Sequence, residues 1–338
     1  MSSLHPAKSQ LTPWWRTHGF LIGLVVAVVL GFVIPGPGSR HGFLKPDISG
    51  NAGIALILFF QGLSLALEKI KSGAANWRLH LIIQCFTFLV FPMVGWLMNA
   101  AMPLLLPDQP QAVRDGFLYL CVLPSTISTS VVLTAVAGGN TAGALFNAAF
   151  SNILGVVVTP VLVHLMMQQT GETGDFGPLL LKITLLTLLP FGLGMALRPA
   201  LKPVVEQFKL WMTRISNLVV LFIVYAAFCE SVEEQIWSRY GASLTLQISG
   251  LVVFLFTFMS ALVWLSCKGL RLERGDLIAA YFCSVKKTLA MGVPLAMLIF
   301  GERPDLTLIL LPVMFYHPLQ LFINGLLANR WARHPVAG

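Results

Sequence analysis

Residues 117–140 read FLYLCVLPSTISTSVVLTAVAGGN, an apolar segment interrupted near its middle by a proline and a run of hydroxyl side chains. Pro124 has no backbone N–H, and its ring blocks the carbonyl four residues earlier, so a helix here is kinked or broken. The segment predicts either a broken helix with a polar midpoint, or a simple proline kink whose hydroxyls bond back to the helix. The hydroxyl residues are Ser125, Thr126, Ser128, Thr129 and Ser130.

A second segment, residues 277–300, reads LIAAYFCSVKKTLAMGVPLAMLIF and carries Lys286 and Lys287 at its middle. One lysine at the centre of a bilayer costs about 2.5–3.5 kcal/mol on insertion scales. A break in this helix would let the lysines face a polar cavity, or let one reach a carbonyl at the end of a half-helix. The alternative is a helix that begins after two interfacial lysines, but a segment starting at Thr288 is too short to span.

Composition places the rest of the chain in lipid. Of the 338 residues 56% are hydrophobic and 11% charged, and the mean hydropathy is +0.80. Soluble domains carry about a quarter charged residues, and no core at this length could hide so much apolar surface. The net charge of +8 comes from basic residues in short loops, which indicates membrane topology and not a nucleic-acid partner. The five cysteines lie in or beside apolar segments without zinc spacing, so we expect them to pack as small hydrophobes.

Runs of about 20 apolar residues predict ten transmembrane helices in one membrane domain that covers residues 1–338. The first run is expected to be an uncleaved helix. Of the 22 Lys and Arg residues, fourteen lie on the side of the termini and six on the other, so both termini are predicted in the cytoplasm of a protein of the inner membrane. The predicted helices are 19–36, 50–67, 80–102, 117–137, 142–168, 179–197, 215–231, 246–267, 277–300 and 306–328.

The chain predicts an internal repeat. A shift of 161 residues places Asp115 on Asp276 and the helix at 117–137 on the helix at 277–300. With five helices in each copy, about 19–168 and 179–329, the second copy enters the membrane from the opposite face. In such inverted repeats, substrate and ion sites lie near the midplane on discontinuous helices. We therefore expect an all-α membrane protein in which the fourth and ninth helices are broken and cross.

Polar residues of the fifth helix are further candidates. Asn147 and Ser151 are four residues apart and share a helix face. With Thr129 and Ser130 they could coordinate a sodium ion, or they could join helices, which is the commoner role of Ser and Asn in membrane bundles. Asn152 lies beside them, and Thr87 and Gln84 are weaker candidates of the same kind. Glu230 is expected to be an exposed loop acid, the alternatives being a pair with a basic group or a place in the outer vestibule. His317 and His164 could each be a buried histidine bonded to a carbonyl or a proton relay.

These segments resemble the bile acid:sodium symporter family, within it the branch of bacterial symporters related to a vertebrate member of unassigned substrate. The similarity runs from about Trp14 to Arg333, and its most specific pieces are residues 117–140, FCSVKKTLAMGVP (282–294) and WRLHLIIQCFTFLVFP (77–92). The resemblance implies ten helices, a panel and a core domain, crossing fourth and ninth helices, and sodium-driven uptake of organic anions such as bile acids.

Carried over by position, the resemblance places the fourth-helix motif on Pro124, Ser125, Thr126, Thr129 and Ser130, and cation ligands of the fifth helix near Asn147 and Ser151. A family glutamine falls on Thr87. The ninth-helix motif, a glutamate followed by Gly-Met-Gln-Asn, reads Cys283, Val285, Lys286, Lys287 and Thr288 here. The acidic ligand is therefore absent and two cations stand at neutral positions. A lysine ammonium could repel sodium and replace it, which opens proton coupling or uncoupled exchange.

The expected function is secondary transport of a small organic anion by alternating access, with Lys286 and Lys287 attracting the anion or standing in for a cation. A membrane binding or regulatory protein on the same fold is the first alternative. An ion channel ranks below it, because channels need continuous polar rings. The sequence carries no Walker loop, GxSxG or dinucleotide motif, so we expect neither an enzyme nor a cofactor other than sodium. The expected partners are the anion and the lipid bilayer, with no obligate protein.

Overall fold

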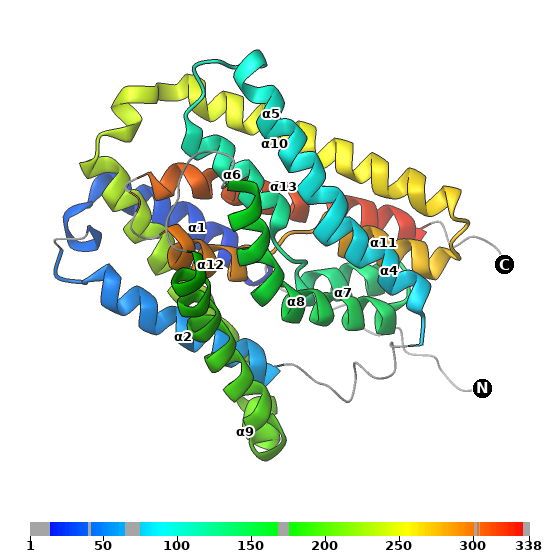
Figure 1. The fold of residues 1–338 in the computed structure, drawn as a ribbon. Coiled ribbons are helices and arrows are strands. Elements are labelled where there is room, and N and C mark those ends of the chain that lie inside the picture. The colour runs from blue at the N-terminus through cyan, green and yellow to red at the C-terminus, as the bar shows by residue number, and fades with distance from the viewer. Residues whose placement is uncertain are drawn as a thin grey trace.

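The computed structural model describes residues 14–39, 42–64, 75–167, 176–300, 303 and 305–333, and within these ranges every regular element is helical. The predicted all-α class is confirmed. The helices are drawn in Figure 1. Their bounds are α1 Trp14–Val33, η1 Gly36–Gly38, α2 Pro46–Ser64, α4 Trp77–Cys85, η2 Phe86–Val90, α5 Phe91–Leu105, α6 Gln111–Val122, α7 Ile127–Val136, α8 Thr141–Met167, α9 Phe176–Glu233, α10 Ile236–Gly269, α11 Arg274–Val285, α12 Leu289–Phe300 and α13 Leu306–Arg333.

Several of these helices are long and apolar enough to cross a membrane. In the described part of the chain six segments meet this test, or seven if the bent pair α6–α7 counts as one span. Two shorter apolar helices, Gly19–Val33 and Ile48–Ser64, fall below the length of a full span. A multi-pass membrane protein follows from this. The count of ten helices stays a prediction.

The long helix α9 replaces two predicted helices, 179–197 and 215–231, and its contacts with α2 show that it reverses direction. A Cβ built on Gly62 of α2 would collide with the Phe191 carbonyl oxygen, and one on Gly53 would collide with Val219. The two glycines are nine residues apart, about 14 Å along a helix, whereas a straight helix would separate Phe191 from Val219 by about 42 Å. The chain therefore turns back between these contacts and packs both legs on α2.

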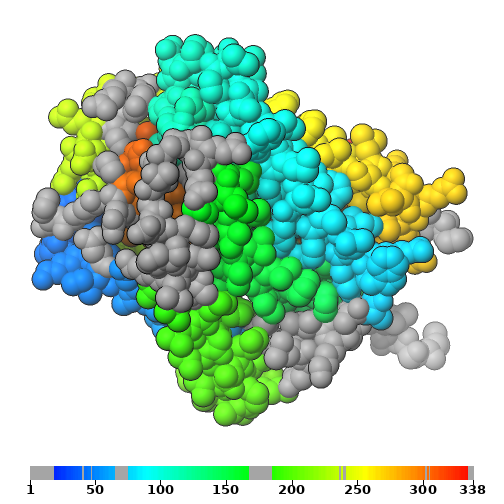
Figure 2. All heavy atoms as spheres, viewed as in Figure 1, coloured from blue at the N-terminus to red at the C-terminus, as the bar shows by residue number. Residues whose placement is uncertain are grey.

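Two groups of helices result. α1 and α2 pack chiefly on α9. α4, α7 and α8 pack on α11, α6 and α7 pack on α13, and α5 packs on α6, while α10 lies against α11 and α13. α12 contacts members of both groups, namely α13, α9 and α2. In the space-filling view only a small orange area, the colour of the end of α12 and the start of α13, is visible between other elements (Figure 2), and most side chains of α12 are buried.

Both predicted helix breaks are present. α6 ends at Val122 and α7 begins at Ile127, with a bend of 59° between them. α11 ends at Val285 and α12 begins at Leu289, and Figure 1 shows the extended segment that joins them. Because α11 already begins at Arg274, the alternative of a short helix preceded by interfacial lysines is wrong.

Candidate functional site at the crossing of two broken helices

The two helix breaks lie against each other. The Thr288 N–H, in the second break, donates to the Pro124 carbonyl in the first break at 3.1 Å. The Ser130 hydroxyl of α7 donates to the Phe282 carbonyl of α11 at 3.2 Å. One backbone and one side-chain bond thus join segments about 150 residues apart in sequence. The predicted crossing brings the polar midpoints of both helices to one place.

Each carbonyl from Cys121 to Ser125, at the end of α6 and in the first break, has a partner from another part of the chain. This matters because unwound carbonyls at membrane depth have no water to bond. Side chains of α8 supply two of the partners. The bonds are Lys287 Nζ to Cys121 O (2.9 Å) and to Leu123 O (2.8 Å), Thr159 Oγ1 to Val122 O (2.8 Å), Thr288 N to Pro124 O (3.1 Å) and Asn152 Nδ2 to Ser125 O (2.7 Å).

The second break is held by two side chains of α13. The Lys287 N–H donates to Gln320 Oε1 at 2.8 Å, and Gln320 Nε2 donates back to the Lys287 carbonyl at 2.7 Å. The Tyr316 hydroxyl donates to the Val285 carbonyl at 2.8 Å. Gln320 therefore binds a carbonyl of the second break, as Asn152 of α8 binds a carbonyl of the first. Each amide comes from the helix that follows the broken pair, α13 after α11–α12 and α8 after α6–α7.

Lys287 is fully buried and all its donors are used. Its ammonium donates to the carbonyls of Thr87 (3.3 Å), Cys121 (2.9 Å) and Leu123 (2.8 Å). The ammonium also lies 4.0 Å from the centre of the Phe91 ring, within cation–π range. An ammonium has three N–H donors, so this set is complete. The prediction that one lysine reaches carbonyls at the end of a half-helix is therefore met by Lys287, at the end of α6.

Lys286 is equally buried but its surroundings differ. Its side chain has no exposed surface, and its Nζ has no hydrogen-bond partner in the described structure. Cys283 on α11 and His317 on α13 are close enough to interact with it electrostatically. His317 packs edge-to-face on Phe20 of α1, with ring centres 6.0 Å apart. Lys286 is thus linked, through His317 and the contact of His317 with Phe20, to the helix group of α1, α2 and α9.

The other predicted hydroxyl residues divide into buried and exposed ones. Thr126 and Thr129 share a hydrogen bond at 2.8 Å, and Thr126 also bonds Ser130 at 3.1 Å. Ser125, Thr126 and Ser130 are buried and Thr129 is half-buried; they form one network at the first break, where the Ser125 N–H also donates to Ser151 Oγ at 3.1 Å. Ser128 is exposed on α7 and lies outside this network.

The four residues considered for sodium are held by different contacts. Asn147 turns to α4, where its Oδ1 accepts from Gln84 (3.2 Å) and its Nδ2 bonds His80 (2.8 Å). This is the helix-joining role left open by the sequence. The hydroxyl oxygens of Ser151, Thr129 and Ser130 take part in the bonds given above, and among the described residues no group of three or more His, Cys, Asp or Glu side chains could hold a metal ion. A sodium site at these four residues stays a prediction.

Sequence reasoning missed Gln320, Thr159 and Tyr316. Gln320 stands in an apolar helix one turn after His317, to which it bonds at 3.1 Å, and the rule that singled out the lysines could have found it. Thr159 and Tyr316 carry no signal of their own, because one hydroxyl in an apolar helix is common. His164 and Glu230 are only partly buried.

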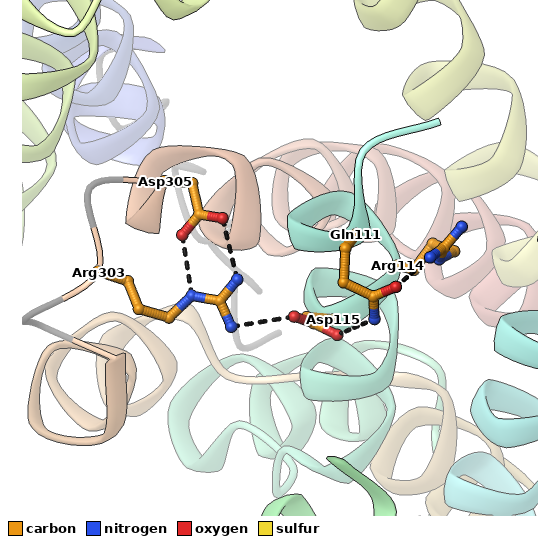
Figure 3. Close-up of polar contacts among 5 residues, drawn as sticks. All are labelled: Gln111, Arg114, Asp115, Arg303 and Asp305. Carbon is orange, nitrogen blue, oxygen red and sulfur yellow. Dashed lines mark hydrogen bonds and ion pairs between the residues drawn. The ribbon is translucent and has the colours of Figure 1, made fainter. Parts of the chain in front are cut away.

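Each broken helix is also held near its start by an aspartate. Asp115 accepts from Gln111 (2.8 Å) and Arg303 (3.1 Å), and Arg303 also pairs with Asp305 (2.9 Å); Figure 3 shows this chain of contacts. Asp276 accepts from Asn140 at 2.7 Å and from Asn76. Asp115 of α6 therefore binds Arg303, in the connection between α12 and α13. Asp276 of α11 binds Asn140, in the connection between α7 and α8.

Comparison with known proteins identifies the family of this chain. A family model described as the SBF-like CPA transporter family matches residues 18–333. The chain is 34% identical to the Escherichia coli K12 protein named "Putative symporter YfeH" over 93% of its own length and 92% of that protein. It is 32% identical to Sodium/bile acid cotransporter 7 of Rattus norvegicus over 92% of each chain.

Proposed function

This chain belongs to the SBF-like CPA transporter family, and on that premise we propose that it carries a small organic anion across the inner membrane as a secondary transporter. The proposal includes alternating access between two helix groups, cytoplasmic termini and a site at the crossing of the broken helices. The names of the relatives, symporter and sodium/bile acid cotransporter, point to the same class of activity and to an anionic organic solute.

The observation that carries the proposal is the buried, unpartnered ammonium of Lys286. A buried cation without a partner is strongly unfavourable, so the side chain either binds an anion or gives up its proton. A carboxylate or sulfonate that enters the crossing would give Lys286 the charge-assisted bond that no side chain supplies. Lys286 is therefore the anion-binding residue of the proposal, and Ser125, Thr126 and Ser130 line the same midpoint.

The paired bonding of the two breaks supports the inverted repeat. Asn152 and Gln320 each bind a carbonyl of one break from the helix that follows the broken pair, and Asp115 and Asp276, which the 161-residue shift superimposes, each bind a residue of the other repeat. Substrate sites of inverted-repeat transporters lie between the repeats at discontinuous helices. The packing of α2 on both legs of α9, with α1 also on α9 and α12 as a contact to the helices that carry the crossing, is suited to rigid-body rocking of one group against the other.

We propose further that sodium does not drive this transporter through the crossing. Two lysines stand where the resemblance puts neutral ion ligands, and Asn147 is engaged with α4. At short range in a medium of low dielectric, fixed ammonium groups repel a second cation. Coupling to a proton carried by Lys286, or exchange of one anion for another, is compatible with the same geometry.

Flux into proteoliposomes tests the proposal. Purified full-length protein is reconstituted, and uptake of labelled taurocholate, a short aliphatic carboxylate and an alkylsulfonate is measured in sodium and in choline buffers. We expect uptake of at least one anion, equal in both buffers. Since hydrogen bonds to charged groups contribute about 1.5–3 kcal/mol, Lys286→Met should bind that anion about 10- to 150-fold more weakly.

The matched control is Lys209→Met, which removes an exposed lysine of α9. It should transport like the wild type. Uptake by Lys286→Met at the wild-type rate and affinity would refute the role of Lys286. Absence of flux for all three anions would favour a binding or regulatory protein, and a strict need for sodium would refute the proposed coupling.

A further inference from the structure

We propose that the Lys287 ammonium is a permanent, tethered substitute for a monovalent cation, held in a carbonyl cage that binds a free cation once the side chain is removed. The cage consists of the carbonyl oxygens of Thr87, Cys121 and Leu123 together with the face of the Phe91 ring. It lies among α5, α6 and η2, on a different set of contacts from the unpartnered Lys286.

The Thr87 carbonyl is free to bind because of an irregular turn in its own helix. Residues Phe86–Val90 form a π-helix, in which the Phe91 N–H bonds to the Phe86 carbonyl five residues earlier. Phe91 is therefore not available to Thr87, its usual partner four residues on. The next residue, Pro92, has no N–H. The π-turn and the proline together leave one carbonyl turned toward the lysine, as such turns do at functional sites.

The other two carbonyls are free because α6 ends. The last carbonyls of a helix have no donor within it, and they carry the negative end of the helix dipole. For Cys121, the N–H four residues later belongs to Ser125 and donates to Ser151 instead. Lys287 bonds the carbonyls of both Cys121 and Leu123. The end of α6 thus faces the ammonium with partial negative charge.

The charge of Lys287 is balanced without a carboxylate. No acidic side chain of the described residues pairs with it, and all three of its donors go to carbonyls. Carbonyl dipoles and a ring face are the groups with which proteins hold bare monovalent cations and ammonium ions. A lysine that served only as a cap needs one or two bonds. Three carbonyls that converge from two helices form a coordination shell.

The inference goes beyond the proposed function, because it concerns a cation that is part of the chain and requires no transported anion. Removal of the side chain beyond Cβ should leave three buried carbonyls aimed at a space that had held an ammonium. Such a space is unfavourable when empty and should be filled by a cation of similar size, namely ammonium, methylammonium or potassium.

The test is the thermal unfolding midpoint of purified full-length Lys287→Ala in detergent, titrated with chlorides of ammonium, methylammonium, potassium and sodium against choline at equal ionic strength. We expect this variant to unfold below the wild type in choline, and its midpoint to rise with the logarithm of the ammonium or methylammonium concentration. The wild type should show no such rise. Neither should Lys287→Met, whose side chain fills the cage, nor Lys286→Ala, which leaves the cage occupied by Lys287.

A variant that does not fold in choline still decides the question. Membranes that contain Lys287→Ala are then solubilised in methylammonium chloride and in choline chloride, and a monodisperse protein peak is expected in methylammonium alone. Aggregation in both salts, the same response in the wild type, or wild-type stability of Lys287→Ala without any cation response would overturn the proposal. The cation response and the anion flux are separate readouts, so failure of one leaves the other standing.

Discussion

Gln320→Met is the substitution that most directly loosens the second helix break. Gln320 is fully buried on α13 and holds both backbone groups of Lys287, accepting from its N–H at 2.8 Å and donating to its carbonyl at 2.7 Å. Methionine has similar length and is apolar, so the change removes both bonds without leaving a large cavity. The N–H and the carbonyl then remain buried at membrane depth without partners.

The expected loss follows from these two groups. A buried polar group left unsatisfied costs about 1–3 kcal/mol, so two such groups cost about 2–6 kcal/mol. In a large domain a destabilisation of 1 kcal/mol lowers the unfolding midpoint by about 2 °C. We therefore expect Gln320→Met to lower the midpoint by about 4–12 °C. The assay is tryptophan fluorescence of the purified chain in detergent, heated at a fixed rate.

Asn324→Leu is the matched control on the same helix. Asn324 is also fully buried, but neither atom of its side-chain amide has a hydrogen-bond partner in the described structure. Leucine has the same number of heavy atoms and the same branching, and it removes a buried amide that gains nothing from its position. The midpoint should stay constant or rise. Equal losses in the two variants would refute the reasoning, because the effect would then reflect packing of α13 and not the bonds to the break.

Three further substitutions test other contacts. Thr159→Val keeps the shape but removes the bond to an α6 carbonyl, so it should cost about 1–3 kcal/mol in thermal unfolding, and Thr159→Ser should recover most of this loss. Asp115→Asn leaves Arg303 without its buried carboxylate, so the unfolding midpoint should fall at low salt; no change would show that Asp305 alone suffices. Gly62→Ala places a methyl group against the α9 backbone and should lower the midpoint by several degrees, whereas Gly192→Ala, which meets open space, should not.

Much of the fold could be predicted because lipid imposes simple rules. Apolar runs of spanning length predicted the helices, and Pro124 and the two lysines marked both breaks to within a few residues. The two legs of α9 were predicted as two separate helices, but the chain stays helical between them. Apolar content alone does not distinguish the helical turns around Pro199 and Pro203 from a loop, so the continuous helix could not be predicted.

The candidate site was only partly predictable, because the role of each polar residue depends on its partner. Both lysines read alike in the sequence, yet one fills a carbonyl cage and the other has no partner. The difference arises from the extended backbone at Lys286, which turns adjacent side chains to different surroundings. Asn147 shares a helix face with Ser151 as expected, but its amide bonds to α4, whose rotation about its own axis cannot be derived from composition.

The central claim is that Lys286 binds an organic anion while Lys287 stays bonded to the carbonyls of α6. The measurement that tests it most directly is a titration of the wild type and of Lys286→Met with the anion taken up in the flux assay, kept below its micelle concentration if it is taurocholate, followed by the unfolding midpoint. A ligand that binds only the folded state raises this midpoint with the logarithm of its concentration. We predict a rise in the wild type, and in Lys286→Met the same rise only at concentrations about 10- to 150-fold higher. An equal rise in both, or none in the wild type, would contradict it.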